Sequence, residues 1–146
     1  MIIADDHEVV RIGLRALIAR MPGITVIGEA ESGKEAMQLV EELTGFDRSS
    51  IVVEGQNGEH RDKDHPLVIV VMDVRMPDGS GIDACRVIRE RYPALKVIML
   101  TSYVDDEAMF ASFSAGASGY ILKHIGGEEL IRAIKTVAEG GAYLDP

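Results

Sequence analysis

Apolar residues follow two alternating patterns along the chain. Short runs rich in aliphatic residues are typical of strands, and they lie at residues 2–4, 24–30, 67–74, 95–101 and 119–123. Longer stretches with an apolar residue every three or four positions are typical of amphipathic helices, and they lie at residues 8–21, 32–43, 82–92, 105–115 and 128–139. This fivefold alternation predicts a parallel sheet with helices on both faces.

Residues 44–66 interrupt this alternation between a helix and a strand, where two to six residues would normally suffice. The segment is polar and rich in Gly, Asp and His, so we expect a surface insertion. His60 and His65 lie near Asp62 and Asp64 in this segment. The sequence does not indicate a metal site here, because it shows neither a definite fourth ligand nor a fixed geometry for these residues.

Composition narrows the class of protein. A chain of 146 residues suits a single domain, and 47% apolar with 5% aromatic residues suits an aliphatic interior. The formal net charge of -9 disfavours direct binding to nucleic acid. No apolar run approaches the roughly 20 residues that a membrane-spanning helix needs, and the acidic start differs from a signal peptide. We therefore expect a cytoplasmic protein that does not contact membranes.

Polar residues that could carry chemistry follow the predicted strands. Asp5 and Asp6 follow the first strand, Asp73 and Thr101 end the third and fourth, and Lys123 ends the fifth. In open α/β sheets, ligands bind outside the carboxyl ends of the strands. Residues far apart in sequence should therefore meet in one crevice.

Three carboxylates in one crevice repel each other unless a cation or protons bind. Mg²⁺ suits such a set, and a carboxylate beside it can attack phosphorus. Lys123 would neutralise an incoming phosphoryl group, and the Thr101 hydroxyl would contact one of its oxygens. Taken singly, each residue is more often a helix cap, a turn residue or a solvated charge. Their joint placement at strand ends favours a phosphoryl-transfer site.

Four motifs resemble the response regulator receiver family: ADDH at residues 4–7, MDVRMPDGSG at 72–81, LTS at 100–102 and GYILK at 119–123. The resemblance covers nearly all of residues 1–146 except the insertion. It implies a flavodoxin-like, doubly wound, five-stranded parallel sheet with strand order 2-1-3-4-5 and helices on both faces.

The resemblance also implies the metal ligands and the phosphoacceptor. Asp73 matches the aspartate that accepts the phosphoryl group. Asp6 matches a direct ligand of Mg²⁺ (or Mn²⁺), Asp5 matches its acidic companion, and the backbone carbonyl of Arg75 matches a third protein ligand.

Further positions match residues that respond to the phosphoryl group. Thr101 and Lys123 match the switch hydroxyl and the phosphate-binding lysine, and Tyr120 matches the aromatic residue that turns inward on activation. Arg75 and Tyr103 flank the expected path of attacking water and should tune dephosphorylation. The surface at residues 105–139 should change with phosphorylation. Such a domain catalyses phosphorylation and dephosphorylation of its own aspartate and is not a conventional enzyme.

The segments at residues 6–15 and 140–144 are most similar to the NarL/FixJ subfamily. In that subfamily a helix-turn-helix domain usually follows the receiver, so residues 140–146 would begin the linker to it. The resemblance implies phosphorylation by a sensor histidine kinase, a homodimer on phosphorylation, and control of transcription. DNA would be contacted only through the C-terminal domain, which these residues do not include.

Three other classes of protein could share some of these residues. A haloacid-dehalogenase-type phosphatase is disfavoured, because it needs a second acid two residues after the nucleophile, where Arg75 stands. A dinucleotide-binding module is disfavoured too, because it needs a glycine-rich motif after the first strand, where residues 5–8 read DDHE. A receiver-like module that is never phosphorylated remains an alternative, because of the insertion and a first strand shorter than is usual in the family. His124 replaces the proline that often follows the family lysine, so we expect a trans peptide bond there.

Overall fold

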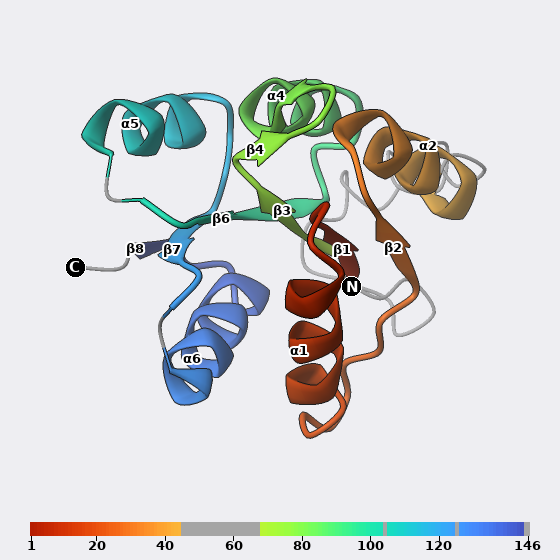
Figure 1. Ribbon diagram of the computed structural model, residues 1–146, viewed down its shortest axis with the longest axis vertical. Helices are drawn as coiled ribbons and strands as arrows, with labels where there is room; N and C mark the ends of the chain where they lie inside the picture. Colours follow the sequence, from red (N-terminus) through yellow and green to blue (C-terminus); the bar gives the residue numbers. More distant parts are fainter. Residues whose placement is uncertain (45–67, 104, 125, 145–146) are drawn as a thin grey trace.

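The computed structural model describes residues 1–44, 68–103, 105–124 and 126–144. Strands and helices alternate through these residues as the sequence predicts (Figure 1). In chain order the elements are β1 (Ile2–Ala4), α1 (Glu8–Ile18), β2 (Gly28–Ala30), α2 (Gly33–Thr44), β3 (Ile69–Asp73), β4 (Arg75–Met76), β5 (Gly79–Ser80), α4 (Gly81–Arg91), β6 (Lys96–Thr101), α5 (Asp106–Ser114), β7 (Gly119–Leu122), α6 (Gly127–Ala138) and β8 (Tyr143–Leu144).

The main sheet has six parallel strands in the order β2-β1-β3-β6-β7-β8. Its first five strands confirm the predicted order 2-1-3-4-5. The sixth strand, β8, pairs with β7 through Gly119↔Tyr143 and Tyr120↔Leu144. From the sequence, these residues are predicted to begin a linker, because two residues are too few to show a strand pattern.

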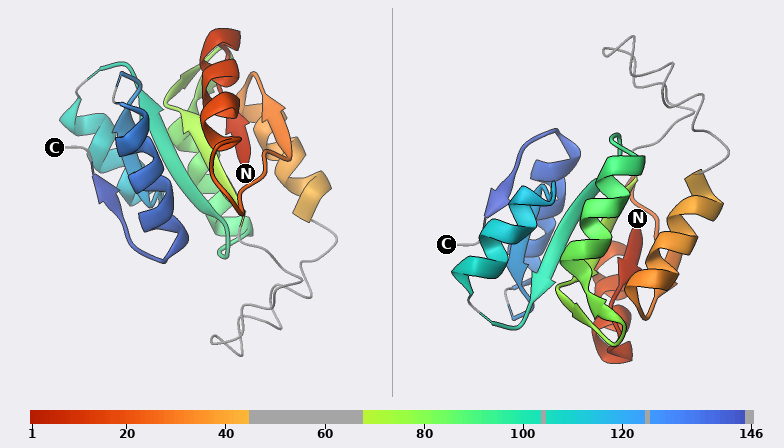
Figure 2. Two further views of the ribbon diagram at one scale, coloured as in Figure 1. Left: turned by 90° about the horizontal axis from the view of Figure 1, so that it is seen from below. Right: turned by 90° about the horizontal axis from the view of Figure 1, so that it is seen from above.

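Helices cover both faces of the sheet. In Figure 1, α1 and α6 lie on one face, and α2, α4 and α5 lie on the other. The two views of Figure 2 look at these faces in turn. The fold is therefore the doubly wound arrangement that the alternation predicts.

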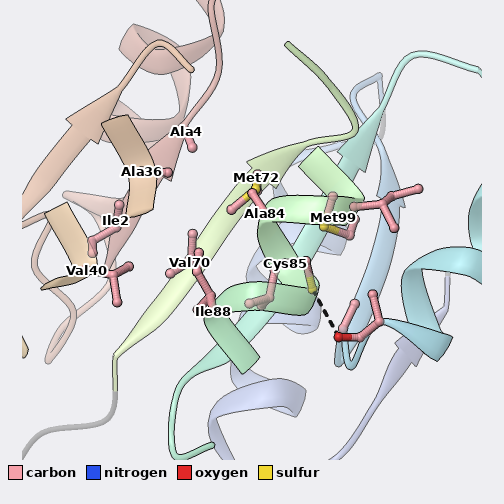
Figure 3. Close-up of a cluster of buried hydrophobic side chains, with 14 of the residues drawn as sticks. Ile2, Ala4, Ala36, Val40, Val70, Met72, Ala84, Cys85, Ile88 and Met99 are labelled. Carbon is pink, nitrogen blue, oxygen red and sulfur yellow. Dashed lines mark hydrogen bonds between the residues drawn. The ribbon is translucent and has the colours of Figure 1, made fainter. Parts of the chain in front are cut away.

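The central strand β3 contributes to the core on both faces. All five of its residues are buried, and successive side chains point to opposite faces of the sheet. Val70 and Met72 pack with residues of α2 and α4, whereas Ile69 and Val71 pack with residues of α1 and α6. Figure 3 shows the first of these clusters, with Cys85 fully buried and its thiol 3.8 Å from the carbonyl oxygen of Ala115.

Several strands and helices begin or end at other residues than predicted, because contacts with neighbouring elements set their bounds. The strand predicted at 24–30 is reduced to β2, because its neighbour β1 pairs with it only from Ile2↔Gly28 to Ala4↔Ala30. The helix predicted to reach Met21 ends at Ile18, and a turn follows it. The loop after β3 contains the short antiparallel pair β4–β5, which the apolar pattern of the sequence does not indicate.

No helix within the described ranges is long and apolar enough to cross a membrane. Apart from Thr44, which ends α2, the predicted insertion and its histidine and aspartate residues lie outside the residues that the structure describes.

Candidate functional site

Parallel pairing brings the ends of three strands to one edge of the sheet. Asp5 follows β1, Asp73 ends β3, and Lys123 follows β7. Because Ala4 pairs with Met72 in register, the residues that follow them become neighbours. The predicted convergence of these side chains is therefore present in the fold.

Lys123 lies between two buried carboxylates. Its ammonium nitrogen Nζ donates to Oδ2 of Asp73 at 2.9 Å, and it lies 2.8 Å from Oδ2 of Asp5. Asp5 is fully buried, and Asp73 is 5% exposed. Oδ2 of Asp5 has the Lys123 ammonium as a counter-charge, but it accepts no well-directed hydrogen bond from the described residues. A buried carboxylate oxygen is therefore left with capacity for a further ligand.

The pKa values in this cluster reflect burial and mutual charge. Burial raises the pKa of Asp73, a hydrogen bond from Lys123 opposes the rise, and the charge of Asp5 adds to it. Burial alone would lower the pKa of Lys123, but its close contacts with the carboxylates of Asp5 and Asp73 outweigh this effect and raise it. Lys123 is therefore firmly cationic, whereas a second negative charge beside Asp5 is unfavourable without another cation.

The acidic cluster has the donor atoms that a metal ion requires. Ligand atoms of Asp5, Asp6, His7 and Asp73 all lie within 4.8 Å of one another. Three of these side chains are carboxylates, which suit a hard divalent cation. Such a cation agrees with two features of the cluster. Oδ2 of Asp5 accepts no directed hydrogen bond from the described residues, and the negative charge exceeds that of the single Lys123 ammonium. The cluster could therefore hold a metal ion.

Arg75 and Tyr103 stand beside this cluster and contact each other. The backbone N–H of Arg75 donates to Oδ1 of Asp73 at 3.3 Å. The Arg75 guanidinium carbon lies 5.4 Å from the centre of the Tyr103 ring, a cation–π contact. Both side chains are exposed, Tyr103 by 63%. The two residues predicted to control water access thus form one exposed pair.

Thr101 contacts the backbone of Tyr103, and Tyr120 contacts the residue before α5. Oγ1 of Thr101 accepts from the backbone N–H of Tyr103 at 3.3 Å. The Tyr120 hydroxyl donates to the carbonyl oxygen of Asp105 at 3.4 Å, and its ring is buried, with 5% exposure. Burial raises the pKa of Tyr120, while a hydrogen bond with Thr101 opposes that rise. The two predicted switch residues therefore both contact the loop between β6 and α5, and the Tyr120 ring is turned inward.

His7, which follows β1, and Arg11, which lies in α1, had no predicted role. Nδ1 of His7 lies 3.0 Å from Oδ1 of Asp5 and 3.3 Å from Oδ1 of Asp6. Arg11 is buried, and its Nη1 donates to the carbonyl oxygen of Asp5 at 2.7 Å. Helical spacing could have identified Arg11, because it shares the buried face of α1 with Leu14. His124, by contrast, is exposed, and its bond to Lys123 is trans, as expected.

The glycine at position 81 allows α4 to start close to the end of β3. A Cβ added to Gly81 would lie 1.9 Å from the carbonyl oxygen of Asp73, which no side chain can accommodate. Its N–H donates to the carbonyl oxygen of Val74 at 2.7 Å. The close approach fixes the loop that connects β3 with α4.

Comparison with known proteins agrees with this geometry. A family model described as the response regulator receiver domain matches residues 46–135. The DNA-binding transcriptional activator DevR/DosR of Mycobacterium tuberculosis is 42% identical over 98% of this chain, which covers 56% of that protein. The oxygen regulatory protein NreC of Staphylococcus carnosus is 35% identical over 100% of this chain and 58% of its own length. This chain thus spans little more than half of these relatives.

A solved structure shows the same fold. The LuxR-family two-component response regulator from Aurantimonas superposes with a TM-score of 0.80 and 33% sequence identity, covering 99% of this chain and 88% of that one. The receiver domain of the regulator NarL from Mycobacterium tuberculosis shares the fold, with a TM-score of 0.73 and 21% identity over 95% of this chain and 94% of that one. The chain therefore belongs to the receiver domain family of two-component response regulators, and its relatives are of the NarL/LuxR type.

Proposed function

We propose that this receiver takes a phosphoryl group onto Asp73 and changes its surface in response. The observation that supports this most directly is the buried Asp73 carboxylate, 2.9 Å from Lys123 and within the acidic cluster. Such a carboxylate is a nucleophile, and the neighbouring ammonium can offset the charge of the arriving group.

In the proposed step, a carboxylate oxygen of Asp73 attacks phosphorus. The bond from phosphorus to the donor breaks, and the donor leaves with the electron pair; a histidine donor then takes up a proton, whereas an acyl phosphate leaves as a carboxylate. A phosphohistidine of a sensor histidine kinase or a small acyl phosphate would serve as donor. Lys123 holds Asp73 in place before transfer and contacts a phosphoryl oxygen after it.

Asp5, Asp6, Asp73 and the backbone carbonyl of Arg75 would hold Mg²⁺ or Mn²⁺ here. When bound, the ion would neutralise negative charge on the carboxylates and on the phosphoryl oxygens. Three carboxylates against one ammonium leave an excess of two negative charges, which a divalent cation would balance.

Thr101 and Tyr120 would convert the new charge into a change of shape. A phosphoryl group adds close to two negative charges at neutral pH. The Thr101 hydroxyl would turn toward it and leave its 3.3 Å contacts with Tyr103. Tyr120 is bonded to Asp105 just before α5, so this movement would be passed to the surface at residues 105–139. Arg75 and Tyr103 would restrict the approach of water and so set the lifetime of the phosphoryl group.

The output that we propose follows from the relatives. A longer chain would connect residues 1–146, through a linker beginning near 140–146, to a C-terminal helix-turn-helix domain that binds DNA. Phosphorylation would favour a homodimer and so control transcription in the cytoplasm. DevR/DosR, a DNA-binding transcriptional activator, supports this assignment.

Intact mass spectrometry after incubation with acetyl phosphate and Mg²⁺ tests the proposed function. We expect one phosphoryl adduct, and none in the Asp73→Asn variant or in the presence of a chelator. Circular dichroism would establish that the variant is folded. Folded parent protein without an adduct would contradict the proposal and favour the receiver-like module that is never phosphorylated.

A further inference from the structure

The hairpin β4–β5 lies between the phosphoacceptor strand and α4. Arg75 pairs with Ser80 and Met76 with Gly79, so each strand has only two residues. Its base is held by the Gly81–Val74 hydrogen bond already described. An isolated hairpin is at best marginally stable in water, and this one is very short. The hairpin therefore needs support at its tip as well as at its base.

Asp78, in the turn at the tip, supplies that support from a distant helix. Its Oδ1 accepts from the backbone N–H of Gly33 at 3.0 Å, and its Oδ2 accepts from that of Lys34 at 2.9 Å. Gly33 and Lys34 are the first two residues of α2. Each of the two carboxylate oxygens thus accepts one of the helix N–H groups that have no partner inside the helix.

The start of α2 uses this carboxylate in addition to its own local cap. Ser32, the residue before the helix, accepts from the backbone N–H of Glu35 at 3.1 Å through its hydroxyl. The Glu35 carboxylate accepts from the backbone N–H of Glu31 at 3.3 Å, so this pair forms a capping box that reaches one residue further back than the usual form. Asp78 therefore serves the two donors that the local cap does not.

This contact bears directly on the candidate metal site. The same hairpin begins with Arg75, whose N–H donates to Asp73 and whose carbonyl oxygen is the proposed third protein ligand. If the tip separates from α2, the hairpin retains only its base and its short ladder. The carbonyl of Arg75 would then have more freedom, and ordering it again on metal binding would cost conformational entropy.

We propose that Asp78 is a positioning residue for the metal site. By holding the hairpin against the start of α2, it keeps the Arg75 carbonyl in place for the ion and so raises the affinity of the site for the ion. Binding is reciprocal, so an ion at the site should in turn protect the Asp78 clamp. The inference rests on the proposed magnesium site and adds a residue that does not itself touch the ion.

The test breaks the clamp from each side and measures binding of Mg²⁺ alone by isothermal titration calorimetry. Asp78→Asn keeps the size of the side chain but turns an NH₂ group toward a backbone N–H. Lys34→Pro removes the N–H donor at a first-turn position where proline is tolerated. Lys34→Ala keeps that donor and is its matched control. Asp83→Asn removes an exposed carboxylate elsewhere and controls for charge.

We expect the dissociation constant for Mg²⁺ to rise roughly 10-fold in Asp78→Asn and in Lys34→Pro, the effect typical of residues that orient metal ligands. Lys34→Ala and Asp83→Asn should stay near the parent value. The double variant Asp78→Asn/Lys34→Pro should bind Mg²⁺ about as tightly as the single variant that binds it more weakly, because both substitutions disrupt the same contact.

Hydrogen exchange gives a readout that does not depend on affinity. In the parent protein, Mg²⁺ should slow exchange of the Lys34 amide, and in Asp78→Asn it should not. Unchanged affinity in folded Asp78→Asn and Lys34→Pro, with Mg²⁺ binding intact in the parent, would overturn the positioning role. Absence of Mg²⁺ binding in the parent would instead overturn the proposed metal site.

Discussion

The candidate site has a charged half and a switch half that differ in burial and in the geometry of their contacts. In the charged half, Asp5, Asp73 and Lys123 are buried or nearly so, and their ion pairs measure 2.8 and 2.9 Å. In the switch half, Thr101 contacts Tyr103 through hydrogen bonds of 3.3 Å, and the Tyr103 ring is exposed. The two halves adjoin at the same edge of the sheet.

This difference assigns distinct physical tasks to the two halves. Breaking a buried ion pair by removing one partner typically costs 3–5 kcal/mol, whereas an ordinary hydrogen bond contributes about 1 kcal/mol and an exposed cation–π contact somewhat less. The charged half should therefore change less on phosphorylation than the switch half, with Lys123 passing only from the Asp73 carboxylate to the phosphoryl oxygen next to it. The switch half can rearrange at a cost that a new doubly charged group can offset.

Removing the Lys123 ammonium from between Asp5 and Asp73 should have the largest effect on stability. Lys123→Met leaves Asp5 and Asp73 facing each other without a counter-charge, so the free energy of unfolding should fall by about 3 kcal/mol in metal-free buffer. Saturating Mg²⁺ should restore part of this loss, because the ion binds the folded state. Urea denaturation with and without Mg²⁺ measures both effects.

Lys135→Met on the exposed face of α6 is the matched control and should change stability by less than about 0.5 kcal/mol. If Lys123→Met unfolds at the same urea concentration as the parent protein, the charged half is not held together by this residue. An equal loss with and without Mg²⁺ would mean that the ion does not bind among the carboxylates.

Thr101→Ala should have a smaller effect on stability and a selective effect on the switch. We expect a loss of about 1 kcal/mol in the free energy of unfolding, because the Thr101 hydroxyl contacts are removed. Phosphorylation of Asp73 should still occur. The chain has four tyrosines, so NMR of labelled tyrosine rings can follow Tyr120, whose signal should move less on phosphorylation than in the parent. Equal shifts in both proteins would contradict the role of Thr101.

Arg75→Ala and Tyr103→Ala should change the lifetime of the phosphoryl group with little effect on stability. Their cation–π contact is exposed and contributes about 0.5 kcal/mol, which corresponds to roughly a twofold change in rate. We expect faster loss of the adduct in each variant, followed by intact mass over time. Arg86→Ala, an exposed arginine on α4, should match the parent. If both variants lose the phosphoryl group at the rate of the parent protein, Arg75 and Tyr103 do not restrict the access of water to it.

Acid should affect the exposed clamp of the hairpin only slightly. Backbone hydrogen bonds from Lys34 and then Gly33 lower the pKa of Asp78 below its ordinary value of 3.8. A lowered pKa means that the contribution of Asp78 is present above pH 3.8 and is lost as the pH falls through the lower, folded-state value. The difference in melting temperature between parent and Asp78→Asn should therefore shrink below about pH 4. A difference that is constant from pH 6 to pH 3 would contradict this linkage.

The sequence predicted the arrangement where strand ends carried distinctive residues. Asp73 and Lys123 could be placed because parallel strands bring their carboxyl ends to one edge. Features that depend on contacts between distant segments could not be predicted in this way. Asp78 resembles an ordinary turn residue until α2 lies beside it, and the two residues of β8 show no pattern until β7 provides a partner. Arg11 was missed because a buried arginine is an exception to the apolar pattern used to find the helix.

The most direct test is to locate the phosphoryl group. Borohydride reduces an aspartyl phosphate to an alcohol and so marks the acceptor as homoserine in tryptic peptides. After treatment with acetyl phosphate and Mg²⁺, we predict homoserine at position 73, in the peptide that ends at Arg75. The peptide containing Asp5 and Asp6 should remain unmodified. Homoserine at position 5 or 6, with position 73 unchanged, would contradict the assignment of Asp73 as the acceptor.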